Sequence, residues 1–246
     1  VLSDVLTPRR VTAPRDVRRA RDMPQYDEVF EPIRHAAPDR PFVVGQLGQS
    51  LDGRIATVTG ESRWINGEAA LDHLHRLPAN VDAVVVGIGT AEDDDPCLTV
   101  RRVSGRSPAR VIVDPRGRLK ASANCLNDDG VERVVIGPER AGLPRGVTFI
   151  DVARNEGRLC PRMIAQGLFD HGLRKILIEG GAWTVSRFIE AGAMDRLHML
   201  VAPVILGSGK PGIDLEPIPA IEQLSFQWPW GRISFEGNRG SPQLNS

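Results

Sequence analysis

Residues 176–188 read Ile-Leu-Ile-Glu-Gly-Gly-Ala-Trp-Thr-Val-Ser-Arg-Phe. The aliphatic run leads through Glu179 into two glycines, and the residues that follow have helical spacing, so the stretch predicts a buried strand, a tight turn and a helix. Gly180 and Gly181 let backbone N–H groups come close to a ligand, and the helix N-terminus adds partial positive charge that suits a pyrophosphate. Taken alone, the diglycine favours a tight turn without a ligand.

Short apolar runs continue to alternate with helical segments on both sides of this stretch, from Pro41 onward. Strands are expected at 42–47, 81–88, 110–113, 131–136, 147–150, 175–178, 197–201 and 233–235. Helices are expected at 67–77, 161–171 and 182–191. Strands that alternate with helices predict an α/β domain.

The overall composition predicts one globular domain and a small-molecule partner. A chain of 246 residues with 41% hydrophobic residues can bury one sizeable core. We expect residues 41–246 to form the domain and residues 1–40, whose charges are mixed, to be an N-terminal extension that coats a surface. Lys+Arg and Asp+Glu are balanced at 31 each, so no net field draws the chain to nucleic acid or to a membrane.

The cysteine and histidine patterns predict a cytoplasmic protein without a metal. Cys97, Cys125 and Cys160 have no metal-ligand spacing and cannot all pair, so we expect reduced thiols. No apolar stretch reaches the roughly 20 residues of a membrane span, and the N-terminus lacks an apolar signal core. His73 and His75 would point about 200° apart on a helix, so they predict no metal site.

A second glycine pair, Gly87 and Gly89, stands at the end of the strand expected at 81–88. A dinucleotide-binding fingerprint needs a third glycine three residues later, but Glu92 stands there, so the motif fails. The acidic cluster at 92–95 by itself favours a solvated loop or a helix cap.

Six motifs in order resemble one known family. They are Ser-Leu-Asp-Gly at 50–53, Gly-Glu-Ser-Arg-Trp-Ile at 60–65, Asp-Asp-Pro-Cys-Leu-Thr-Val-Arg at 94–101, Asp-Pro-Arg-Gly-Arg at 114–118, Glu-Gly-Gly at 179–181 and Ala-Pro-Val-Ile-Leu-Gly at 202–207. With similar spacings from about residue 41 to residue 212, the chain resembles the pyrimidine reductase family of riboflavin biosynthesis, which is the reductase domain of the bifunctional deaminase/reductase.

This resemblance implies a fold, an activity and a set of site residues. The fold would be α/β and dihydrofolate-reductase-like, with a mixed, mostly parallel central sheet flanked by helices. The activity would be NADPH-dependent hydride transfer to a ribosylaminopyrimidine phosphate, such as 5-amino-6-(5-phosphoribosylamino)uracil, in a homodimer. The family's substrate contacts fall on Ser62, Leu98, Arg101 and Glu179. Its NADPH contacts fall on Gly48, Trp64, Thr90, Asp94, Gly181, Ala182, Trp183, Thr184, Val185, Ser186 and Arg187.

These residue types suit a reaction in which positioning dominates, because hydride transfer needs two ligands held together in a dry cleft. Arg101 could clamp a phosphate, and Ser62 could donate one hydrogen bond. Glu179 could accept from pyrimidine N–H groups or stabilise positive charge beside the hydride acceptor, and we assign it the catalytic role. The structural alternative pairs Glu179 with a backbone amide or an arginine.

Two positions depart from the family pattern. Many family members carry Lys where this chain has Gln46, and an Arg that touches the substrate phosphate aligns with Pro78. These changes leave open a reductase of the same fold that acts on a pterin-like or other heterocycle, or a non-catalytic nucleotide-binding protein. The zinc deaminase signature of the bifunctional members is absent, so we expect a reductase that does not deaminate.

Two arginines predict a preference for NADPH over NADH. Arg116 and Arg118 follow the strand expected at 110–113. A guanidinium at this place could pair with the 2′-phosphate of the adenosine, because arginine–phosphate pairs are strong and directional.

Overall fold

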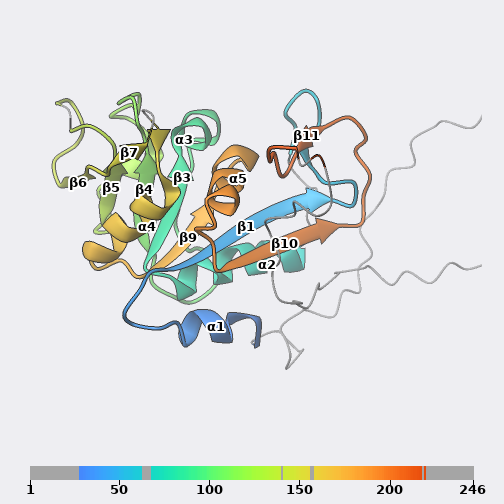
Figure 1. Ribbon diagram of the computed structural model, residues 1–246, viewed down its shortest axis with the longest axis horizontal. Coiled ribbons are helices and arrows are strands. Elements are labelled where there is room, and N and C mark those ends of the chain that lie inside the picture. The colour runs from blue at the N-terminus through green and yellow to red at the C-terminus, as the bar shows by residue number, and fades with distance from the viewer. Residues whose placement is uncertain (1–27, 63–67, 140, 156–157, 218, 220–246) are drawn as a thin grey trace, which may run out of the picture.

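The structure is a computed structural model that describes residues 28–62, 68–139, 141–155, 158–217 and 219. Its centre is a seven-stranded sheet in the order β10-β1-β9-β3-β4-β5-β6 (Figure 1). The strands are β1 (Phe42–Ser50), β3 (Ala83–Gly87), β4 (Ala109–Val113), β5 (Arg133–Ile136), β6 (Val147–Ile150), β9 (Lys175–Glu179) and β10 (Arg196–Ala202). Two short antiparallel pairs join β2 (Arg54–Ala56) to β11 (Lys210–Pro211), and β7 (Arg154–Asn155) to β8 (Arg158–Leu159).

The α/β, dihydrofolate-reductase-like fold with a mostly parallel sheet is confirmed. Within the described residues, every strand pair of the central sheet is parallel. The seven strands expected between residues 42 and 201 all occur, with ends that shift by up to three residues. The eighth strand, expected at 233–235, lies outside the described residues.

The three expected helices are confirmed as α2 (Glu68–Arg76), α4 (Pro161–Asp170) and α5 (Ala182–Glu190). The sequence did not predict two further helices, α1 (Glu31–Arg34) and α3 (Ile88–Asp94), or the 3₁₀ turns η3 (Pro78–Asn80) and η4 (Asn124–Leu126). α3 was missed because it is short and ends in the acidic cluster, which carries no apolar periodicity.

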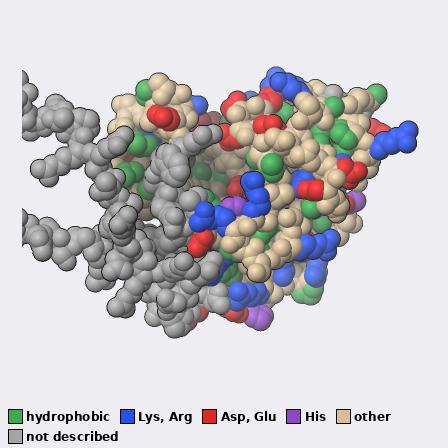
Figure 2. All heavy atoms as spheres, turned by 180° about the vertical axis from the view of Figure 1, so that it is seen from behind, with side chains coloured by type: hydrophobic (Ala, Val, Ile, Leu, Met, Phe, Trp, Pro, Cys, Tyr) green, Lys and Arg blue, Asp and Glu red, His purple; other side chains and the backbone are tan. Residues whose placement is uncertain are grey.

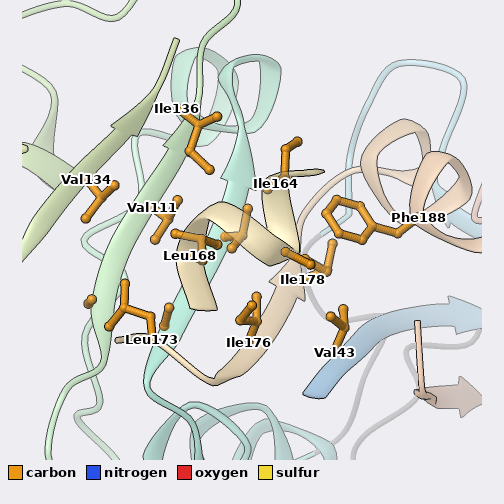
Figure 3. Close-up of a cluster of buried hydrophobic side chains, with 14 of the residues drawn as sticks. Val43, Val111, Val134, Ile136, Ile164, Leu168, Leu173, Ile176, Ile178 and Phe188 are labelled. Atoms are coloured by element: carbon orange, nitrogen blue, oxygen red, sulfur yellow. The ribbon is translucent and has the colours of Figure 1, made fainter. Parts of the chain in front are cut away.

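Helices α4 and α5 cover one face of the sheet. Ile164 and Leu168 of α4 and Phe188 of α5 pack against Ile176 and Ile178 of β9 (Figure 3). Burial of aliphatic side chains on both faces explains why β9 reads as a continuous apolar run rather than as an alternating pattern.

The opposite face is covered in part by the segment before β1. Phe30 and Ile33, beside or within α1, are buried against Val44 of β1, Leu177 of β9 and Leu77 at the end of α2. Phe30 and Ile33 therefore belong to the hydrophobic core, although the sequence places them in the extension at 1–40. Their small apolar cluster was hidden among the charges of that segment.

The surface carries charges of both signs. On the face shown in Figure 2, Lys and Arg side chains are interspersed with Asp and Glu, as the balanced formal charge predicts. None of the described helices is long and apolar enough to cross a bilayer.

Candidate active site

A cleft of about 1820 Å³ opens at the carboxyl ends of β1, β3, β4 and β9. Ligands of parallel α/β sheets bind at this edge, because the loops and helix N-termini that follow the strands converge there. Its wall includes Gln46 and Gly48 of β1, Gly87 of β3 and Glu179 of β9.

The diglycine after β9 forms the strand–turn–helix unit that the sequence predicts. Gly180 has a φ of +153°, and a Cβ built there would lie 3.2 Å from Oγ1 of Thr90. The backbone N–H of Gly181 donates a hydrogen bond to the same oxygen at 3.1 Å, which ties the turn to α3. Gly180 therefore fills a place that a larger residue would strain. The first residues of α5, Ala182 and Trp183, line the cleft, so the N-terminus of this helix lies at the cleft wall.

Glu179 stands at the end of β9, directly before this turn, and lines the cleft. Burial raises the pKa of its carboxyl group to about 7. Among the described residues, no hydrogen bond or ion pair to the carboxyl group is present, so the structural pairing with an amide or an arginine is not observed. A carboxyl group whose charge is uncompensated at a cleft wall is typical of functional sites.

Glu179 belongs to a polar row that crosses the sheet. The parallel register places Gln46 beside Glu179 and beside His198 of β10. His198 Nδ1 lies 3.0 Å from Nε2 of His73 on α2. Burial lowers the pKa of His73 to about 4 and that of His198 to about 3, so both rings are neutral near pH 7. The row therefore offers no cation to Glu179.

The expected site residues divide into three groups. Those that line the cleft are Gly48, Ser62, Thr90, Asp94, Leu98, Glu179, Gly181, Ala182, Trp183, Thr184 and Arg187. Those that do not are Arg101, Val185 and Ser186. Trp64 lies outside the described residues.

The side chains of Val185 and Ser186 contact other parts of the protein instead of lining the cleft. The Val185 side chain is fully buried in the core, and Oγ of Ser186 accepts a hydrogen bond from the backbone N–H of Asp214 at 2.8 Å. A continuous stretch of a helix cannot present every side chain to one cleft, because successive residues rotate by about 100°. The side chains of α5 that line the cleft are Ala182, Trp183, Thr184 and Arg187.

Trp183 gives the cleft an exposed aromatic surface. Its side chain is 62% exposed at the first turn of α5, and the guanidinium carbon of Arg187 lies 6.0 Å from the ring centroid. The arrangement leaves an aromatic face beside the diglycine turn, where a flat ring could stack.

The basic residues of the cleft come from more elements than the sequence indicated. Arg116 and Arg118 line it as expected, but Arg118 also pairs with Glu92 at 3.1 Å. The sequence missed Arg154 and Arg158 of the small β7–β8 hairpin, which also line the cleft. No motif marks these two arginines, because only the folding of the hairpin brings them to the cleft.

The acidic cluster lies at the C-terminal end of α3, and its residues have different surroundings. Asp93 and Asp94 line the cleft, whereas Asp95 has a φ of +41° and accepts hydrogen bonds from the backbone and side chain of Asn124. Asp95 thus ends α3 as its C-cap residue, and its side chain ties this end of the helix to η4. No group of three or more possible metal ligands occurs among the described residues.

Pro78 lies in the 3₁₀ turn that follows α2. It is buried at the first position of η3 and is absent from the cleft wall. Pro78 therefore offers no group to the cleft, and the altered phosphate recognition expected from the missing arginine stays a prediction. A proline fits the start of this turn because its φ is fixed and its missing N–H needs no partner.

We predict that Pro78→Arg lowers the free energy of unfolding by about 1–2 kcal/mol, because a guanidinium must be buried or the turn must open. Urea denaturation of both proteins measures this loss. The variant is also expected to gain no affinity for a pyrimidine phosphate. A variant of unchanged stability that binds the phosphate more tightly would contradict both expectations.

Comparison with known proteins decides the family. Residues 41–228 match the model of the RibD C-terminal domain. The chain belongs to this family. The resemblance in the sequence motifs is thereby confirmed.

Three relatives illustrate the extent of the match. The chain is 34% identical over 176 residues to the 2,5-diamino-6-ribosylamino-4(3H)-pyrimidinone 5′-phosphate reductase of Methanothermobacter thermautotrophicus, covering 68% of this chain and 80% of that protein. It is 33% identical over 177 residues to the riboflavin biosynthesis protein RibD of Aquifex aeolicus, covering 70% of this chain but 49% of that protein. The structure of Acinetobacter baumannii RibD matches with a TM-score of 0.65 and 33% identity, over 75% of this chain and 52% of that one. The chain thus spans about half the length of these RibD proteins.

Proposed function

We propose that this protein is an NADPH-dependent oxidoreductase that reduces the ribosylamino group of a phosphorylated aminopyrimidine. The observation that carries the proposal is the position of Glu179. Its carboxyl group has no partner among the described residues, and it lines the cleft directly before the diglycine turn. The reductases named among the relatives act on such a pyrimidine phosphate. We extend that activity to this chain.

The residues of the cleft fit a dinucleotide phosphate. The N-terminus of α5 and the tight turn at Gly180 suit the pyrophosphate, and Arg116, Arg154 and Arg158 offer positive charge for a further phosphate. Bound NADPH would supply the hydride. The protein's part is to hold the ring of the cofactor against the substrate and to exclude water.

Glu179 is then placed to act on the substrate. As a carboxylate it stabilises positive charge at the carbon that accepts the hydride, or it accepts a hydrogen bond from the pyrimidine. The uncharged neighbours Gln46 and His198 favour this effect, because neither of them is a cation that competes for the carboxylate.

The test is oxidation of NADPH, followed by absorbance, with the pyrimidine phosphate of the relatives and with a pterin. Rapid turnover of the pyrimidine supports the proposal. Turnover of the pterin alone would favour the other heterocycle reductase, and tight NADPH binding without turnover would favour a non-catalytic nucleotide-binding protein. We also propose that the protein is cytoplasmic, in keeping with its three free cysteines. We propose that it is a homodimer, and analytical ultracentrifugation measures the mass that tests this.

We predict that Arg116 gives the preference for NADPH over NADH. Arg116 lines the cleft, and no ion pair to it is found in the described part of the chain, whereas Arg118 is engaged by Glu92. Arg116→Ala should weaken NADPH binding by about tenfold and leave NADH binding unchanged, since a charge-assisted contact contributes about 1.5–3 kcal/mol when well formed. Titration calorimetry measures both constants.

The matched control is Arg106→Ala, which removes an exposed arginine that does not line the cleft. It should leave both dissociation constants unchanged. An Arg116→Ala variant that keeps its preference for NADPH would place the 2′-phosphate elsewhere, with Arg154 and Arg158 as the next candidates.

A further inference from the structure

Gln46 has a buried side-chain amide group without a partner. The side chain is 3% exposed, and neither Nε2 nor Oε1 has a hydrogen-bond partner in the described structure. Gln46 also lines the cleft, one strand away from Glu179. Burying an amide group without hydrogen bonds is costly, so each such group in a folded protein requires an explanation.

The side chain of Gln46 lies on a defined face of the sheet. Alternation along β1 puts it on the same face as Phe42 and Val44, and the register puts Glu179 there as well. Leu74 of α2 and Leu98 also line the cleft, and Leu98 packs against the core cluster that contains Val44. Apolar side chains thus flank the polar row of Gln46, Glu179 and His198. This setting suits a flat ring, which has apolar faces and a polar edge, better than a polyol.

We propose that Gln46 recognises the lactam edge of a heterocycle, that is, a ring N–H beside a ring C=O. Its Oε1 would accept from the ring N–H, and its Nε2 would donate to the ring carbonyl, so a planar ligand edge would satisfy both orphaned atoms at once. A single hydroxyl oxygen cannot form two parallel hydrogen bonds of this kind. The inference rests on the proposed function in placing the heterocycle in this cleft, and it adds which edge is recognised and by which residue.

An internal partner for Gln46 would be the structural alternative. Nε2 of His198, beside Gln46 in the register, also lacks a partner. If a rotation joined these two groups, the Gln46 amide would stabilise the fold, and its removal would destabilise the protein whatever the ligand. If the ligand is the partner, removal should leave the free protein at least as stable, because an unsatisfied amide disappears.

The experiment combines a protein change with a ligand change. Gln46→Met keeps the size of the side chain and removes its hydrogen bonds. The probes are 2,6-diaminopyrimidin-4-one and pterin, each compared with its 4-methoxy analogue, which lacks the lactam edge. Calorimetry in the presence of NADP⁺ measures the affinities, and thermal unfolding without ligand measures stability.

The wild type is expected to prefer at least one lactam over its methoxy analogue by about tenfold or more, as expected for a pair of neutral hydrogen bonds. Gln46→Met should reduce this preference to within about twofold, with an unchanged melting temperature and unchanged NADPH affinity. Gln49→Met is the matched control, because it makes the same change on the opposite face of β1, away from the cleft wall. This control should keep the full preference.

Three results would overturn the inference. In the first, the wild type binds neither lactam. In the second, Gln46→Met keeps the preference for the lactam over its methoxy analogue. In the third, Gln46→Met unfolds, or loses as much affinity for NADPH as for the lactam. Comparing the preference measured with the pyrimidine probe and with pterin shows which of the two ring systems supplies the lactam edge. If the pyrimidine phosphate is not reduced but a lactam preference that depends on Gln46 remains, the proposed function fails and this inference stands.

Discussion

Glu179→Gln is expected to lower kcat by about 100-fold while the Kd for NADPH stays within about twofold of the wild type. The substitution keeps the shape and most hydrogen-bonding capacity of the side chain but removes the charge beside the reacting carbon. Steady-state assays of NADPH oxidation measure kcat, and calorimetry measures Kd. Glu139→Gln, an exposed position outside the cleft, is the control and should change neither.

The pKa of Glu179 adds a pH signature to this prediction. Because burial raises the pKa to about 7, the ionised form becomes dominant only above neutral pH. If the carboxylate stabilises positive charge, kcat/KM of the wild type should rise between about pH 6 and pH 8, and the Gln variant should lose this dependence. A wild-type profile that instead falls above pH 7 would identify Glu179 as a proton donor.

The same shift affects stability. The folded protein binds the Glu179 proton more tightly than the unfolded chain, whose carboxyl group titrates near 4.5. The wild type should therefore lose stability as the pH rises from about 4.5 to 7, whereas Glu179→Gln should not. Above pH 7 the variant should be more stable by on the order of 1–3 kcal/mol. Equal urea midpoints of the two proteins at pH 8 would contradict an uncompensated carboxylate.

Gly180→Ala is expected to have the second large effect, with a loss of folding stability on the order of 3 kcal/mol and of NADPH affinity of tenfold or more. A side chain at a φ of +153° is strained, and its Cβ would press on Oγ1 of Thr90, which anchors the turn through the N–H of Gly181. Moving this turn would misdirect the N–H groups at the start of α5. Thermal unfolding and calorimetry measure the two losses.

The next residue supplies the control. Gly181 has a φ of −57°, and a Cβ there would lie 3.7 Å from Oγ1 of Thr90, an ordinary contact distance. Gly181→Ala should therefore cost about 1 kcal/mol or less, the usual difference between glycine and alanine at a helix N-cap. Equal losses in the two variants would show that the positive φ and the close contact at Gly180 do not decide the geometry of the turn.

The sequence alone determined the α/β class, seven strands of the central sheet, the three longer helices and the strand–turn–helix unit at Glu179. These features depend on local patterns: β-branched runs, helical periodicity and a diglycine that follows a buried strand. The motifs also pointed to the family, because their order along the chain does not depend on where each one lies in space.

Only the tertiary structure decided which side chains share the cleft. Val185 was expected in the site but is buried in the core, and Arg158 was not expected but lines the cleft, since helix rotation and hairpin folding control their directions. Only the structure shows that Pro78 is buried at the first position of η3 and does not line the cleft. Gln46 and Glu179 are neighbours whose polar side chains have no partner in the described part of the chain. The sequence could not show this, because β1 and β9 are far apart along the chain and the sheet register alone makes them neighbours.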